Sequence, residues 1–80
     1  MYRTYILKSS KNNQYYIGYS NDLDNRIKLH NANAVFPTKN KGPWQLLHVE
    51  EFNNERDAVA RERQLKSWKS RAAIEKLILK

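Results

Sequence analysis

The sequence contains no cysteine among its 80 residues, which excludes disulfides and thiolate zinc sites as supports for the fold. This absence is typical of a reducing cytoplasm and excludes the class of small secreted, disulfide-rich proteins. No apolar run approaches the ~20 residues that span a membrane, and the first eight residues lack the apolar core of a signal peptide. We therefore expect a cytoplasmic protein with no membrane partner.

Acidic residues are also scarce, with eight Asp and Glu against fifteen Lys and Arg and a formal net charge of +7. Such an excess favours a polyanionic partner, and nucleic acid above all; the plain alternative is a soluble protein that happens to be basic. Residues 44–53 hold two acids and no basic residue. We expect a positive face built from both ends of the chain, with an internal strand in the middle.

The length allows one domain, residues 1–80, with no room for a second core. Strands are predicted where β-branched and aromatic residues concentrate, and helices where caps are offered before an apolar stripe, by Ser20-Asn21-Asp22, by Asn53 or Asn54, and by Ser70. The predicted elements are strands at 2–7, 15–19 and 44–52 and helices from about 22 to 30, 55 to 68 and 71 to 79. This ββαβαα order predicts an α/β (α+β) sandwich, a three-stranded antiparallel sheet flanked by three helices.

The first predicted helix carries polar residues where apolar ones are expected. At ~100° per residue, Arg26 and His30 lie inside the arc that its leucines and isoleucine define, and they are neighbours at i and i+4. Arg26 could extend its guanidinium to water, and His30 could be a satisfied core histidine. Equally, both could serve a site, because burying a cation is costly without a purpose.

Glu62 lies in the same way inside the apolar arc of the second helix. It could form a buried salt bridge with Arg26, or it could bind a metal ion through its oxygens. A carboxylate, a guanidinium that fits phosphate oxygens and a nearby base are the parts that metal-assisted phosphodiester hydrolysis needs. The helical pattern alone leaves both alternatives open.

The first predicted hairpin holds all five tyrosines of the chain, which are Tyr2, Tyr5, Tyr15, Tyr16 and Tyr19. Tyrosines in strands are usually packing residues with a hydrated hydroxyl. Gly18 is unusual within a strand, because glycine weakens strands unless something approaches closely. Room for a substrate backbone would explain it, and so would a bulge.

Together these residues resemble the GIY-YIG nuclease superfamily, and in particular its short stand-alone bacterial branch. The resemblance covers nearly the whole chain. The stretches that carry it are Tyr16-Ile17-Gly18, Asn21-Asp22-Leu23, Arg26, His30, Trp44 through Phe52, and Ala60-Arg61-Glu62-Arg63-Gln64-Leu65-Lys66-Ser67-Trp68. The resemblance implies a hydrolytic phosphodiester nuclease that uses Mg²⁺ or Mn²⁺.

The resemblance also implies roles for single residues. Tyr5 would activate or position the attacking water, and Tyr16 would contact the scissile phosphate or join proton transfer. Arg26 would stabilise the transition state, His30 would assist as a base or hydrogen-bond partner, and Glu62 would hold the metal ion. Two features depart from the family pattern: Arg3 and Thr4 replace the first motif's glycine and isoleucine, and no asparagine follows Glu62 as in some members.

The predicted function is a metal-dependent endonuclease acting on DNA, including branched or damaged DNA in repair or recombination. The alternative is a nucleic-acid-binding module of the same fold that does not cut, and a third reading is a domain whose basic face docks an acidic protein. The expected nucleic-acid contacts are Gly18, Lys28, Lys39, Lys41, Arg61 and Lys66. We expect no added DNA-binding module, so a protein partner or a homo-oligomer could supply further contacts.

Overall fold

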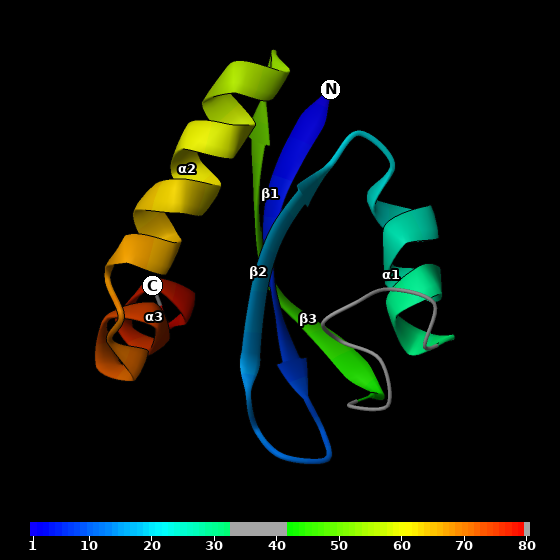
Figure 1. Cartoon of the computed structure of the whole chain (residues 1–80), viewed down its shortest axis with the longest axis vertical. Coiled ribbons are helices and arrows are strands. Elements are labelled where there is room, and N and C mark those ends of the chain that lie inside the picture. The colour runs from blue at the N-terminus through cyan, green and yellow to red at the C-terminus, as the bar shows by residue number, and fades with distance from the viewer. Residues whose placement is uncertain (33–41, 80) are drawn as a thin grey trace.

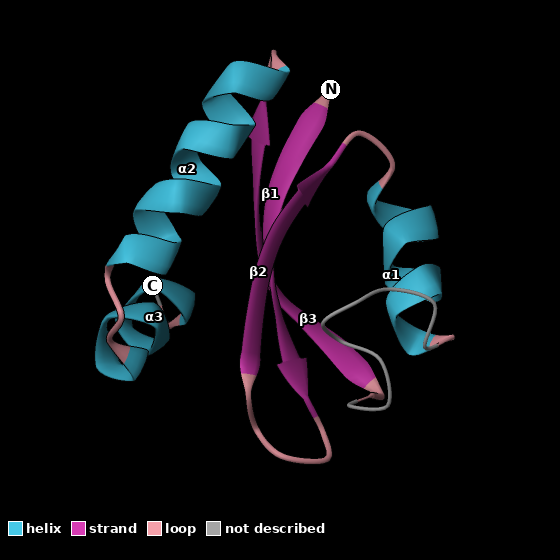
Figure 2. Cartoon of the chain, viewed as in Figure 1, coloured by secondary structure: helices cyan, strands magenta, loops and turns pink. Residues whose placement is uncertain are grey.

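The computed structural model describes residues 1–32 and 42–79. The elements are β1 (Tyr2–Ser9), β2 (Tyr15–Ser20), α1 (Leu23–Asn31), β3 (Trp44–Phe52), α2 (Glu55–Ser67) and α3 (Arg71–Ile78). The predicted ββαβαα order is confirmed. One sheet lies between α1 on one side and α2 with α3 on the other (Figures 1 and 2). No helix in the described ranges is long and apolar enough to cross a membrane.

The three strands form an antiparallel sheet, as the sequence predicted. Their order in the sheet is β2-β1-β3. The expectation that residues 44–53 form the internal strand is wrong, because β1 is central and β3 lies at an edge. Tyr5, Ile6 and Leu7 of β1 are almost fully buried, whereas Leu46 and Val49 of β3 are exposed. The two acidic residues of β3 have basic neighbours on different elements: Glu50 pairs with Arg61 of α2, and Glu51 with Arg3 of β1.

Side chains alternate along β1 and thereby divide the core into two layers. Tyr5 and Leu7 pack with Leu23 and Trp44 on the α1 side. On the opposite side Ile6 packs with residues of α2 and α3, Leu65 and Ile74. The central strand β1 is therefore buried on both faces, although the chain is short.

Each helix begins at one of the side chains that the sequence offered as caps. The Asp22 carboxylate accepts from the backbone N–H of Asn25 at 3.3 Å, and the Asn54 side chain accepts from that of Asp57 at 2.9 Å. The Ser70 hydroxyl oxygen accepts from a backbone N–H in α3 at 3.2 Å. These bonds satisfy N–H groups that the first helical turn leaves unpaired.

Candidate active site

Gly18 and Tyr5 face each other across β1 and β2. Gly18 is buried, and a Cβ atom there would lie 2.7 Å from the Tyr5 hydroxyl oxygen and 2.9 Å from Cζ. The space above Gly18 is thus occupied by the Tyr5 phenol rather than open to a substrate backbone. The register between β1 and β2 is unbroken around Gly18, so the glycine is required for a close approach and not for a bulge.

Around Tyr5 the structure gathers an aromatic cluster on the α1 face of the sheet. The Tyr5 hydroxyl and His30 Nε2 share a hydrogen bond of 3.1 Å, and both residues are almost completely buried. The Tyr16 ring lies 4.9 Å from the His30 ring, in an edge contact. Trp44 completes the cluster, 6.3 Å from Tyr16 between ring centroids. The inward direction predicted for His30 is confirmed.

Trp44 belongs to this cluster, although the sequence predicted it only as the first residue of a strand. The one feature that could have indicated a role was its aromatic side chain, which follows the stretch between the helix predicted to end near residue 30 and the strand predicted to begin at residue 44. Its position on the α1 face depends on the pairing of Trp44 with Ser9 at the far end of β1.

Arg26 extends from α1 toward the same cluster, and its Nε–H is buried with no hydrogen-bond partner among the described residues. Buried donors are nearly always paired, so this one indicates a missing acceptor. Within the described chain no ion pair joins Arg26 to Glu62, because Glu62 pairs with Lys66 instead, at 3.2 Å. The salt-bridge alternative left open by the sequence is thereby excluded.

The cluster shifts the ionisation of two of its members. Burial raises the pKa of Tyr5 to about 12; the adjacent Arg26 guanidinium partly offsets this, while the charges of Tyr16 and Glu62 raise the pKa further. Burial, together with the charge of Arg26, lowers the pKa of His30 to about 4. At neutral pH the site therefore holds a protonated phenol and an uncharged imidazole.

Glu62 reaches this region from α2, on the other side of the sheet. Its charge is the smallest of the influences on the Tyr5 pKa, and its side chain is 15% exposed. Tyr5, Tyr16 and His30 lie in contact with Arg26 beside them, whereas the ion pair of Glu62 is with Lys66 of its own helix. The helices α1 and α2 lie on opposite faces of the sheet (Figure 1).

Glu62 supplies one carboxylate to a prospective metal site. No group of three or more His, Cys, Asp or Glu side chains in residues 1–32 and 42–79 is arranged to hold a metal ion. A single carboxylate fits Mg²⁺ or Mn²⁺, because such hard ions keep several waters and take phosphate oxygens as ligands. The Lys66 ammonium contacts the Oε1 atom of this carboxylate and would compete with a metal ion for it.

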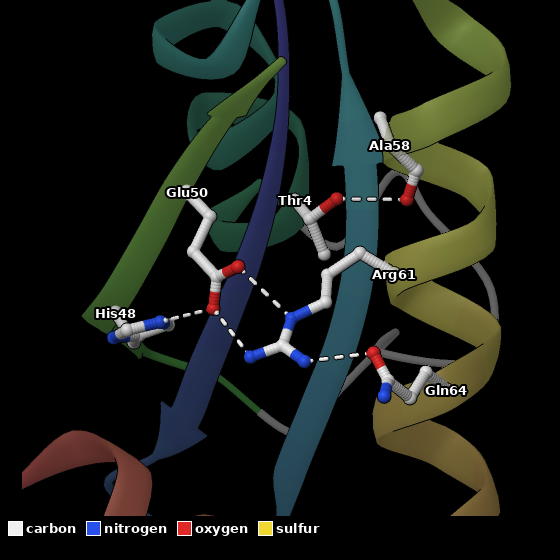
Figure 3. Close-up of polar contacts among 6 residues, drawn as sticks. All are labelled: Thr4, His48, Glu50, Ala58, Arg61 and Gln64. Carbon is white, nitrogen blue, oxygen red and sulfur yellow. Dashed lines mark hydrogen bonds and ion pairs between the residues drawn. The ribbon is translucent and has the colours of Figure 1, made fainter.

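The predicted nucleic-acid contacts are dispersed. Lys28 is exposed on α1, and Lys66 lines a cavity beside β2. Arg61 is engaged in the fold: its Nε and Nη2 donate to Glu50 at 2.9 and 3.0 Å (Figure 3). Lys39 and Lys41 lie outside the described residues.

Comparison with known proteins places these observations in a family. The chain matches the GIY-YIG catalytic domain over residues 1–76. It is 42% identical over 64 residues to the UPF0213 protein CPE1444 of Clostridium perfringens, which covers 78% of this chain and 67% of that protein. It is 39% identical over 59 residues to the UPF0213 protein YazA of Bacillus subtilis, and spans 59% of that relative's length.

Two further relatives match almost the whole chain. The UPF0213 protein VNG_2274C of Halobacterium salinarum is 35% identical over 78 residues, 96% of this chain and 99% of that protein. The solution NMR structure of the UPF0213 protein BH0048 from Bacillus halodurans superposes with a TM-score of 0.61 at 31% identity, covering 98% of this chain and 83% of that one. None of these names specifies an activity. The match over nearly the full length shows that the chain belongs to the GIY-YIG catalytic domain family, whose members are generally endonucleases, and to its UPF0213 group.

Proposed function

We propose that this protein is a divalent-metal-dependent endonuclease that hydrolyses phosphodiester bonds in DNA. The observation that carries the proposal is the buried Nε–H of Arg26, which has no hydrogen-bond partner in residues 1–32 and 42–79. A charged donor in that position costs free energy until an anion binds it. A phosphate oxygen is the acceptor that a guanidinium fits best, in a bidentate pair.

The burial of the other residues divides their proposed roles. Tyr16, Arg26 and Glu62 keep some exposure and are proposed to face the substrate, with the Tyr16 hydroxyl on the scissile phosphate. Tyr5 and His30 are 1% and 0% exposed, so neither reaches solvent. We therefore propose them as positioning residues: their hydrogen bond holds the His30 ring against Tyr16 and fixes the surroundings of the Arg26 guanidinium.

In the proposed reaction a water attacks phosphorus while the bond to the leaving strand breaks. Arg26 stabilises the negative charge that develops on the phosphate oxygens. An uncharged His30 matters here, because a second cation beside Arg26 would repel it and disturb its placement. Glu62 would hold Mg²⁺ or Mn²⁺, which supplies further charge neutralisation and lowers the pKa of a bound water.

The proposal is tested by Glu62→Gln, which keeps the shape of the side chain and removes the charge. Labelled flap, nicked, duplex and single-stranded DNA are incubated with Mg²⁺ or Mn²⁺. We expect wild-type cleavage and a loss of roughly 10²-fold or more in the variant, the scale of losing a transition-state contact. Glu55→Gln, an exposed glutamate at the start of the same helix, is the matched control and should cut normally. Equal cleavage by Glu62→Gln, or no cleavage by the wild type, would refute the proposal.

A second candidate function is a nucleic-acid-binding module of the same fold that does not cut. The contact between Lys66 and Glu62 favours this second candidate, because the Lys66 ammonium lies on the carboxylate that a metal ion would need. Arg3 and Thr4 in place of the family glycine and isoleucine point the same way. This candidate predicts salt-sensitive DNA binding by the wild type without turnover in either metal.

A further inference from the structure

A cavity of about 400 Å³ lies along β2, between this strand and the region where α2 ends and α3 begins; we name it the β2-edge pocket. Its floor is apolar and aromatic, and its rim is basic. The floor includes Tyr15, Ile17, Leu65 and Ile74, and the rim carries Lys66, Lys69 and Arg71. Figure 1 shows the α2–α3 turn beside the first half of β2.

Three residues join the β2-edge pocket to the candidate active site. Tyr16 and Trp44 line the pocket and also lie against the His30 ring. Lys66 lines the pocket and pairs with Glu62. A strand of nucleic acid whose phosphate contacts Tyr16 therefore passes beside this cavity.

One cation on the rim, Arg71, is held in place by its neighbours. The Arg71 guanidinium lies 4.4 Å from the centre of the Tyr15 ring, donates from Nη1 to the carbonyl oxygen of Asn13 at 2.7 Å, and pairs through Nε with Glu75 at 3.1 Å. Its remaining N–H groups are left for an anion. An ordered cation loses little conformational entropy when it binds a phosphate.

Lys69 adopts a left-handed backbone conformation, with φ of 46°. Glycine is the usual residue where a chain leaves a helix in this conformation, because a Cβ atom is strained there. The chain instead places an exposed lysine at this position on the pocket rim. Strain retained at a pocket is a reason to look for a binding role.

We propose that the β2-edge pocket binds one unpaired nucleotide of the substrate strand, next to the scissile phosphate; this rests on the proposed nuclease function. The three cations suit the phosphate, and the floor suits a base, whose flat faces stack on aromatic and apolar side chains. A base inside a duplex has both faces covered by its neighbours and offers only its groove edges. The substrate class is therefore DNA with a single-stranded segment adjoining the cleavage site.

Binding is measured by fluorescence anisotropy in EDTA, so that cleavage is not needed. Three labelled DNAs are compared: a blunt duplex, the same duplex with a single-stranded tail, and that tailed duplex with abasic tail nucleotides. We expect the tailed duplex to bind at least about fivefold more tightly than the abasic form, the lower range for stacking of one base. Equal affinity for tails with and without bases would overturn the pocket's role in binding a base, and equal affinity for tailed and blunt DNA would overturn the preference for an unpaired strand.

Lys69→Gly tests the pocket itself. It removes a cation and relieves the left-handed strain, so thermal stability should be unchanged or higher and unfolding cannot explain a loss of binding. We expect two- to fivefold weaker binding of the tailed duplex, roughly the effect of one exposed ion pair, and little change with the blunt duplex. Lys76→Ala, an exposed lysine on α3 outside the pocket, is the control and should affect both DNAs alike. Equal effects of Lys69→Gly on the two DNAs would refute a role of the pocket in binding the unpaired nucleotide.

The two proposals fail in different ways. If the protein prefers tailed DNA in EDTA but never cuts, the nuclease function is refuted and the pocket assignment stands. If it cuts tailed and blunt DNA equally well and Lys69→Gly has no selective effect, the nuclease function stands and the pocket assignment is refuted.

Discussion

At the scale of single residues, Tyr5 and Gly18 depend on each other. The phenol occupies the space that a side chain at position 18 would fill. This places the Tyr5 hydroxyl within hydrogen-bond distance of His30. The absence of one Cβ atom on β2 therefore determines the geometry of a polar contact with α1.

This dependence predicts the cost of Gly18→Ala. The new methyl group would meet Tyr5 atoms below 3.0 Å, and overpacking of this kind costs about 1–3 kcal/mol. In a Tyr5→Phe background the nearest clashing atom is gone, so the same substitution should cost less. Chemical denaturation of the wild type, both single variants and the double variant measures the coupling, expected at about 0.5 kcal/mol or more. Additive costs would contradict the proposed contact.

His30 predicts a dependence of stability on pH. Its pKa is lowered from 6.5 to about 4 in the folded state, so between these values the unfolded chain binds a proton that the folded chain rejects. The free energy of unfolding should therefore fall as pH decreases from 6.5 to 4, by at most ~1.4 kcal/mol per pH unit.

The comparison for this prediction is His30→Gln, which cannot titrate in that range. Urea denaturation at several pH values should give a steeper acid slope for the wild type than for the variant. The slopes are compared rather than the absolute stabilities, since any substitution at a fully buried position also changes packing. Parallel profiles would show that His30 keeps an ordinary pKa.

At the scale of elements, α2 is attached to the sheet by polar contacts as well as by apolar packing. The Thr4 hydroxyl donates to the Ala58 carbonyl at 2.8 Å, and Glu50 of β3 accepts from Arg61 and lies 2.8 Å from His48 Nε2 (Figure 3). Burial raises the pKa of Glu50, but the hydrogen bonds and charges of Arg61 and His48 outweigh it and lower the pKa overall. The interactions of ionised Glu50 therefore stabilise the fold above the ordinary carboxyl pKa. This stabilisation is lost in acid, as the pH falls through the lowered pKa of Glu50.

The network predicts different effects of two arginine substitutions on α2. Arg61→Ala leaves Glu50 without its main partner and should cost about 1–3 kcal/mol of unfolding free energy. Arg63→Ala, an exposed neighbour, should cost less than about 0.5 kcal/mol. Thermal denaturation measures both. If Arg61 served nucleic acid rather than the fold, its loss would leave stability unchanged and weaken DNA binding more than the loss of Arg63.

At the scale of the whole molecule, the net charge of +7 is carried by a domain with a radius of gyration of 12.0 Å. We expect the logarithm of the DNA association constant to fall linearly with the logarithm of salt concentration. A slope of magnitude about 2.7 or more would correspond to at least three phosphate contacts on duplex DNA. Anisotropy titrations between about 50 and 200 mM salt provide the measurement, and a flat dependence would favour an acidic protein or no polyanion as the partner.

The elements and caps were predictable because they depend on neighbours in the sequence. Asp22, Asn54 and Ser70 cap their helices through bonds that span three residues. The strand order was not predictable in the same way, since both edges of β1 accept a partner. The prediction that residues 44–53 form an internal strand was wrong. The charges along a strand depend on the side chains that face it, and not on whether the strand is central or at an edge of the sheet.

By itself the sequence determined the family, the order of elements and the inward direction of His30, because these follow from residue type and spacing. Only the tertiary structure decided what each polar residue meets. It paired Glu62 with Lys66 and not with Arg26, bound Arg61 to Glu50, and filled the space above Gly18 with the Tyr5 ring. Side chains far apart in the chain meet through sheet register and helix docking, and these geometries depend on the packing of the whole molecule rather than on any local segment.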